Sequence, residues 1–261
     1  MAVVGKIESL WRYPVKSMRG EELGAAHLGF AGVYGDRLYA FRSSARPAGF
    51  PYLTARERAE MLLYRPRFRD PARAALPPNL AEAERMAPGL NPVPASPSDL
   101  AVEVETPSGE ILPVEDPRLI RALDRGKGAT PSLLRSERGM TDCRPVSLFS
   151  VQTARRLAEE LGLAVDKRRF RANIFLDLAG SEGFAEDGFV GRRLRLGAKA
   201  VVSILERDPR CAMISLDPDT AERNPAVLAK VAKAHGGMAG VYAAVLVEGV
   251  VRPGDEVEVL E

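Results

Sequence analysis

Cys211 is the residue whose type and setting point most directly to chemistry. It follows two cationic residues, Arg207 and Arg210, and precedes the acidic, turn-forming run at 217–219. Fixed positive charge favours the thiolate form of a cysteine, and a thiolate binds soft metals or attacks electrophiles. The alternative is a small buried hydrophobic residue at the end of the apolar run 201–205, because free cysteines are often buried.

Lys16 and Ser17 are a second candidate, at the end of the predicted strand 7–11. Pro14 fixes the backbone just before them, so both residues are expected in a turn. An ammonium, a hydroxyl and nearby N–H groups suit an anion, and Arg37 adds a planar guanidinium. Spacing alone favours a simpler interpretation, in which these cations are solvated and Asp36 pairs with Arg37.

Two further sets lie at the starts of predicted strands. Arg171 and Asn173 alternate, so they would point to the same side of a strand and suit a phosphate and a polar ring edge. A strand edge with polar residues explains this pair equally well. Asp142 and Cys143 precede the predicted strand 146–149, and an ordinary loop is the favoured interpretation there.

Composition excludes several classes of function. The chain has 261 residues, 37 basic against 35 acidic, and a formal charge of +2, which does not suit a general nucleic-acid binder. No apolar run approaches the length of a membrane span. Two cysteines without an export signal are expected reduced, in the cytoplasm. The two isolated histidines, His27 and His235, exclude a histidine-based zinc site or a Ser-His-Asp triad.

The pattern of turns and apolar residues predicts mostly strands. Expected strands are 7–11, 22–28, 38–41, 61–64, 101–105, 146–149, 173–178, 194–196, 201–205, 241–247 and 256–260. The proline-rich stretch 71–97 is expected to loop over the surface. Helices are expected from Asp116, Ser150 and Asn224, each a suitable N-cap.

Strand-rich halves with isolated helices indicate closed or nearly closed barrels and not a doubly wound parallel sheet. The predicted fold class is therefore mainly β with a few helices (α+β). Glycine, lysine, serine and arginine replace apolar periodicity at 126–140. We expect the domains to be 1–125 and 126–261.

Taken together, the motifs resemble the MOSC family, named after the C-terminal domain of molybdenum cofactor sulfurase. The likeness is to its two-part members, such as the mitochondrial amidoxime-reducing component and bacterial counterparts. Four motifs carry it: Tyr-Pro-Val-Lys-Ser at 13–17, Gly-x-x-x-Asp-Arg at 32–37, Arg-Phe-Arg-x-Asn at 169–173, and Arg-Cys at 210–211 with Asp-Pro-Asp-Thr at 217–220.

The resemblance implies an N-terminal β-barrel-like domain packed on a MOSC β-barrel domain, with a molybdenum–pterin cofactor in the cleft between them. Cys211 would be the thiolate metal ligand and the catalytic residue. The implied cofactor-binding residues are Lys16, Ser17, Arg37, Arg171, Asn173, Arg210 and Tyr242, with Asp142 and Cys143 in a loop whose identities match the family poorly.

The implied activity is molybdenum-dependent reduction of small N-hydroxylated compounds such as amidoximes or hydroxylamines. Two cysteines cannot ligate an iron–sulfur cluster, so electrons are expected from a separate flavin or iron–sulfur protein. The alternative is a carrier of molybdenum cofactor or of persulfide sulfur on Cys211. Some members of the family are described as binding pyridoxal phosphate, but Lys16 is the only conceivable Schiff-base lysine and lacks a characteristic context.

The chain departs from its relatives at four positions. Ala172 replaces a frequent proline, Ala221 a frequent glycine, and Phe189 a usual tryptophan. Pro209 stands before Arg210 where close relatives have a small polar residue, so a donor is expected to be missing there.

Overall fold

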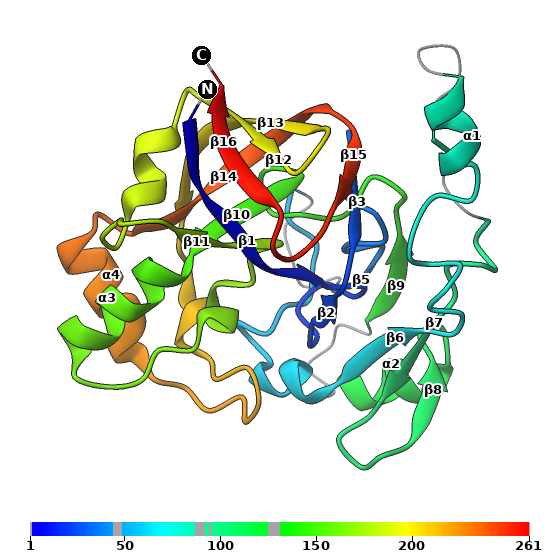
Figure 1. The fold of residues 1–261 in the computed structure, drawn as a ribbon. Helices are drawn as coiled ribbons and strands as arrows, with labels where there is room; N and C mark the ends of the chain where they lie inside the picture. The colour runs from blue at the N-terminus through cyan, green and yellow to red at the C-terminus, as the bar shows by residue number, and fades with distance from the viewer. Residues whose placement is uncertain (1, 44–48, 87–91, 94–95, 125–130, 261) are drawn as a thin grey trace.

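The computed structural model describes residues 2–43, 49–86, 92–93, 96–124 and 131–260, and its largest element is a closed seven-stranded β-barrel (Figure 1). The strand order around the barrel is β11-β10-β14-β13-β12-β16-β1, and β1 returns to β11. These strands are β1 (Ala2–Arg12), β10 (Val146–Ser150), β11 (Ile174–Leu178), β12 (Arg193–Leu196), β13 (Ala200–Pro209), β14 (Met238–Val247) and β16 (Glu256–Leu260).

The N-terminal strand closes this barrel. β1 pairs antiparallel with β16 on one side and with β11 on the other, and it lies in blue beside the red β16 in Figure 1. The other barrel strands all come from residues 146–260. The expected boundary at 125/126 falls on residues 125–130, outside the described part, and stays a prediction.

The remaining strands form small sheets beside the barrel. β2 (Glu21–Leu23) extends the barrel sheet from β1. The small sheets comprise β3 (Ala26–Gly29), β4 (Gly32–Val33) and β15 (Gly249–Val251); β5 (Tyr39–Arg42) and β9 (Ser132–Arg135); and β6 (Arg65–Phe68), β7 (Val102–Glu105) and β8 (Ile111–Pro113). The expected fold class, mainly β with a few helices, is confirmed.

The α-helices lie outside the barrel, and three begin at the predicted N-caps. They are α1 (Leu80–Arg85), α2 (Pro117–Leu123), α3 (Val151–Leu161) and α4 (Pro225–Ala234). The side chains of Asp116, Ser150 and Asn224 accept hydrogen bonds from the first turns of α2, α3 and α4. No helix of the described residues is long and apolar enough to cross a membrane.

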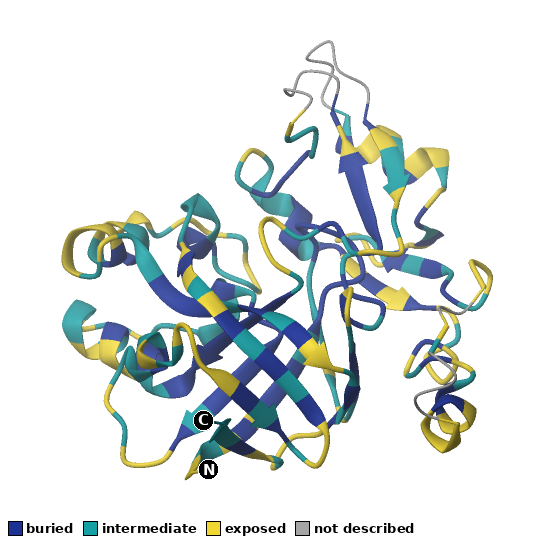
Figure 2. Cartoon of the chain, turned by 90° about the horizontal axis from the view of Figure 1, so that it is seen from above, coloured by how far each residue is buried: buried dark blue, intermediate teal, exposed yellow. Residues whose placement is uncertain are grey.

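Three clusters of buried side chains hold these elements together. Figure 2 marks the buried residues in dark blue along the strands and helices. One fills the barrel, one lies under the small sheets of the N-terminal half, and one packs α3 and α4 against the barrel. The third includes Phe149 and Phe170, whose rings stack 4.2 Å apart. Phe149 belongs to β10 and Phe170 precedes β11, so this contact fixes the segment before β11.

Two predicted strands are wrong. Residues 61–64 belong mostly to the 3₁₀ helix η1 (Ala59–Leu63), because an apolar run this short does not distinguish a strand from a helical turn. The expected strand 22–28 is interrupted between β2 and β3, where Gly24 lies in a bend. The proline-rich stretch contains the six-residue helix α1.

Candidate active site

One cleft, which we call the Cys211 cleft, collects side chains from distant parts of the chain. Its empty volume, including open solvent at its mouth, is about 760 Å³. Nine of the ten predicted site residues line it: Lys16, Ser17, Arg37, Asp142, Arg171, Asn173, Arg210, Cys211 and Tyr242. The tenth, Cys143, is exposed and does not line the cleft, so it is not a candidate for contact with a cofactor there.

Lys16 is buried and not solvated. Its Nζ donates to the carbonyl oxygen of Met140 at 2.8 Å and forms an ion pair with Asp142. Burial lowers the pKa of Lys16, and the Asp142 carboxylate opposes this shift. The simpler interpretation of a solvated lysine is therefore wrong.

Ser17 and Arg37 are held in unusual backbone conformations. Their φ angles are +69° and +48°, in the left-handed region that non-glycine residues seldom adopt. Arg171, which also lines the cleft, has a φ of +52°. Of the five described non-glycine residues with positive φ, three line this cleft. Backbone strain of this kind concentrates at functional sites, where the surrounding structure maintains it.

Arg37 and Arg171 converge on one tyrosine. Their guanidinium carbons lie 4.6 and 4.2 Å from the centroid of the Tyr13 ring. Arg37 forms an ion pair with Asp36, as the simpler interpretation expected, and Asp36 also accepts a hydrogen bond from the Tyr13 N–H. Burial raises the pKa of Tyr13 to about 12, so its ring stays neutral beside the two cations.

Arg171 has no carboxylate partner. No ion pair of the described residues includes it, and its Nη2 atom is buried without a hydrogen-bond partner there. Burial lowers the pKa of Arg171 to about 10, and the charge of Arg37 adds to this effect. Arg171 is still charged at neutral pH and is not directly paired with a carboxylate of the described residues, so an anion in the cleft would stabilise it.

The expectation that Arg171 and Asn173 alternate along a strand is wrong. Arg171 follows the 3₁₀ helix η2 (Lys167–Phe170) in a left-handed conformation, and β11 begins only at Ile174. The Asn173 amide is already bonded within the barrel, where it accepts from the Ser147 N–H at 3.2 Å and donates to the Trp11 carbonyl at 3.3 Å. It fixes the wall of the cleft.

Arg210 positions the backbone before the thiol. It donates to the carbonyl oxygens of Ala239 at 2.6 Å and Phe170 at 2.8 Å, and it pairs with Asp208 at 2.8 Å. Gly240 allows this approach, because a Cβ atom there would lie 3.0 Å from Arg210 and 2.7 Å from a backbone oxygen. Cys211 then begins the 3₁₀ helix η4 (Ala212–Ser215), partly exposed to the cleft.

Asp208 lines the cleft beside Tyr242, and it was not among the site residues predicted from the sequence. Asp208 is 2% exposed, and burial raises the pKa of its carboxyl to about 6. A side-chain hydrogen bond from Tyr242 and the charge of Arg210 oppose that shift. The sequence did contain a signal for Asp208. It lies three residues before Cys211 on the strand β13, and the inside–outside alternation of that strand places its side chain toward the interior.

Comparison with known proteins decides the family. The model of the MOSC domain matches residues 135–258, and the model of the MOSC N-terminal beta barrel domain matches residues 4–92. The chain belongs to the two-part MOSC family. The MOSC domain family is associated with binding of the molybdenum cofactor.

Solved structures similar to this MOSC protein share little sequence with it. YuaD of Bacillus subtilis is 13% identical, with 98% of this chain and 95% of that chain covered and a TM-score of 0.47. YiiM of Geobacillus stearothermophilus is 21% identical over 45% of this chain and 55% of that chain, with a TM-score of 0.36. YiiM of Escherichia coli is 17% identical over the same shares, with a TM-score of 0.34. No curated protein matches the chain significantly.

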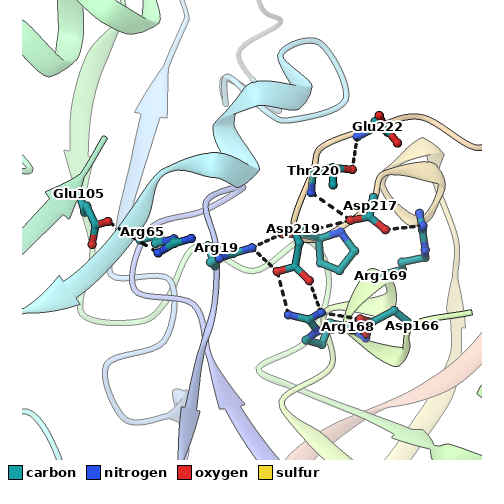
Figure 3. Close-up of polar contacts among 11 residues, drawn as sticks. Arg19, Arg65, Glu105, Asp166, Arg168, Arg169, Asp217, Asp219, Thr220 and Glu222 are labelled. Atoms are coloured by element: carbon teal, nitrogen blue, oxygen red, sulfur yellow. Dashed lines mark hydrogen bonds and ion pairs between the residues drawn. The ribbon is translucent and has the colours of Figure 1, made fainter. Parts of the chain in front are cut away.

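The Asp-Pro-Asp-Thr motif of this MOSC protein joins the two halves of the chain. Asp217 accepts hydrogen bonds from the N–H groups of Asp219 and Thr220, each at 3.0 Å, and so closes the loop. Asp219 lies between Arg19 and Arg168 and pairs with both (Figure 3). Arg19 comes from the N-terminal half, so the motif supports the cleft without lining it.

The MOSC chain brings a single thiol to the cleft. Among the described residues, no group of three or more histidine, cysteine, aspartate and glutamate side chains could hold a metal ion. The lining of the cleft provides one thiol, the thioether of Met213, the carboxyl groups of Asp142 and Asp208, several cations and a few hydroxyl or amide groups.

Proposed function

We propose that the Cys211 cleft binds a molybdenum–pterin cofactor and that the protein reduces N-hydroxylated compounds. The observation that carries the proposal is the buried, unpartnered Nη2 atom of Arg171, a residue that lines the same cleft as the single thiol. A phosphate would satisfy the guanidinium, and a thiolate is a suitable ligand for a soft metal that a cofactor already carries. The donor set therefore fits this cofactor.

Arg171 and Ser17 would hold the phosphate end, while Lys16, which is already bonded to Met140 and Asp142, and Arg37 would add positive charge from the N-terminal half. Arg210 and Asn173 would act differently, because the Arg210 Nε and Nη1 atoms and the Asn173 amide are hydrogen-bonded within the protein and Arg210 Nη2 pairs with Asp208. They fix the two strands that flank the site. Cys211 would bind the metal as thiolate.

When bound, the cofactor would supply the two-electron chemistry that removes an oxygen atom. Reduction of a hydroxylamine to an amine breaks one N–O bond, consumes two electrons and two protons, and releases water. The electrons would come from a separate flavin or iron–sulfur protein. We place the reaction in the cytoplasm, where the thiol stays reduced.

Asp208 is the group we assign to hold a proton for this reaction. It lines the Cys211 cleft, and its carboxyl remains partly protonated near neutral pH because burial disfavours the charged form. Arg210 and Tyr242 fix its orientation. The other titratable or charged groups that act on it are Asp142 and Arg37.

The test is turnover by protein purified from a host that makes the molybdenum cofactor. With a chemical reductant in place of the donor protein, we expect an amidoxime to be converted to its amidine, and Cys211→Ser to abolish the conversion. A carrier would instead release intact cofactor, or bear sulfane sulfur on Cys211, without turnover. Protein that contains the cofactor and gives no reduction of any N-hydroxylated compound would contradict the proposed reaction.

A further inference from the structure

A second cleft lies next to the Cys211 cleft, and we call it the Trp11 cleft. Its empty volume, open solvent included, is about 660 Å³. Trp11, Arg19 and Leu62 line it and do not line the Cys211 cleft. Three lining residues are common to both clefts: Arg169, Arg171 and Met213.

Three arginines that line the Trp11 cleft each have a guanidinium nitrogen without a partner among the described residues. The Nε atoms of Arg19 and Arg169 and the Nη2 atom of Arg171 are buried and make no hydrogen bond to the described residues. All three arginines line the cleft. Unpartnered donors of this kind are costly inside a protein unless a ligand accepts from them. Three together on cationic groups indicate an anion.

Carboxylates outside the cleft hold these arginines in place. Arg19 pairs with Asp219, and Arg169 donates to Asp217 at 2.8 Å (Figure 3). Arg171 rests on the ring of Tyr13. The inner nitrogens are therefore fixed before a ligand arrives, which lowers the entropy cost of binding.

Flat and apolar groups form the rest of the wall. Trp11 and Tyr13 contribute rings, while Leu62 and Leu216 contribute aliphatic surface. The acidic lining residue, Glu22, is exposed. Rings and aliphatic chains favour a planar aromatic ligand over a bare inorganic ion.

We infer that the Trp11 cleft binds a small aromatic anion, a planar ring that carries a carboxylate or a phosphate. This ligand site does not require the molybdenum cofactor, and two of its three donors, the Nε atoms of Arg19 and Arg169, are separate from the Arg171 Nη2 atom on which the proposed function rests. The two sites are adjacent through Arg171, which faces both clefts.

Trp11 provides the readout, because it is the only tryptophan in the chain and it lines this cleft. Benzoate and phenyl phosphate are the probes, and inorganic phosphate is the control without a ring. We expect benzoate to change tryptophan fluorescence saturably with a Kd of about 1 mM, as the size of the ligand allows. We expect inorganic phosphate to give a weaker response.

Three variants locate the probe. Arg19→Gln removes an unpartnered donor of the Trp11 cleft and should weaken benzoate binding about tenfold. Asp219→Asn breaks the same Arg19–Asp219 pair but keeps the donor, so it should weaken benzoate binding less than Arg19→Gln does. Arg56→Gln removes an arginine that lines only the Cys211 cleft and should leave binding unchanged.

Each other outcome overturns the inference. Absence of a saturable response excludes the site, provided that calorimetry also detects no heat of binding. Equal affinity for benzoate and inorganic phosphate removes the role of the ring. Binding that is lost in Arg56→Gln and retained in Arg19→Gln places the probe in the Cys211 cleft. Equal weakening in Arg19→Gln and Asp219→Asn assigns the effect to the broken ion pair.

Discussion

Arg37 donates a hydrogen bond from its Nη2 atom to the backbone carbonyl of Arg171 at 3.1 Å. This contact joins the N-terminal half of the chain to the segment that precedes β11. It brings two guanidinium groups to one tyrosine ring, although only Arg37 has a carboxylate partner. Arg37, which is paired with Asp36, is therefore a structural cation, whereas Arg171 is available to a ligand.

Substitution of the two arginines should therefore have opposite consequences. Arg37→Gln leaves Asp36, which is 4% exposed, without its cation, and should lower the free energy of unfolding by about 3–5 kcal/mol. Arg171→Gln removes a buried, unpaired charge and should leave that free energy within about 1 kcal/mol of the wild type or raise it. Urea denaturation at neutral pH measures both. Arg37 and Arg171 both have a left-handed backbone, so the cost of placing glutamine in that conformation is shared by the two variants. An equal loss of unfolding free energy in both would contradict the view that only Arg37 is a structural cation.

The raised pKa of Asp208 predicts a pH dependence of stability. In the folded protein the carboxyl titrates near pH 6, against 3.8 for its ordinary value, so the folded state binds more protons between these pH values. The stabilising contribution is fully present below about pH 4 and is lost as the pH rises through about 6. Asn at this position cannot titrate.

Urea denaturation of wild type and Asp208→Asn across this range isolates the effect. The free energy of unfolding of the wild type should fall relative to that of the variant as the pH increases. Parallel curves would mean that the carboxyl titrates normally. Other carboxylates act equally on both proteins, so the difference reports Asp208.

Ala221 should be a site of stabilisation. Its φ is +61°, which costs a residue with a Cβ about 1–2 kcal/mol, and relatives often have glycine there. Ala221→Gly loses one methyl contact and gives the unfolded chain more freedom, and both effects oppose the gain. The variant should still raise the free energy of unfolding by about 0.5–1 kcal/mol. Calorimetry measures the shift. Ala154→Gly inside α3 is the control and should destabilise by about 1 kcal/mol or more.

The sequence predicted the regular parts of the fold because their signals are local. The caps Asp116, Ser150 and Asn224 and the alternating strands could be recognised from a few neighbouring residues. It did not show that the N-terminal strand closes the barrel, since strand pairing over more than 160 residues leaves no local pattern. The strand predicted at 61–64 was wrong because four apolar residues are too few to distinguish the two-residue repeat of a strand from the repeat of a helix.

The sequence could predict which residues belong to the site but not which contacts they make. The motifs contain seven of the nine predicted residues of the Cys211 cleft, and the family resemblance added Asp142 and Tyr242. The individual partners of these side chains depend on the tertiary structure. Nothing local indicates that Asn173 is occupied within the barrel or that Arg171 lacks a carboxylate. The Trp11 cleft also escaped prediction, because its walls come from segments without a common motif.

The central claim, that Cys211 binds molybdenum within this cleft, is tested most directly by metal content. Wild type, Cys211→Ser and Cys143→Ser would be purified from a host that makes the molybdenum cofactor and analysed by mass spectrometry. We expect molybdenum in the wild type and in Cys143→Ser, whose thiol is exposed outside the cleft, and its loss from Cys211→Ser. Folded wild-type protein without molybdenum, or equal metal content in all three, would contradict it.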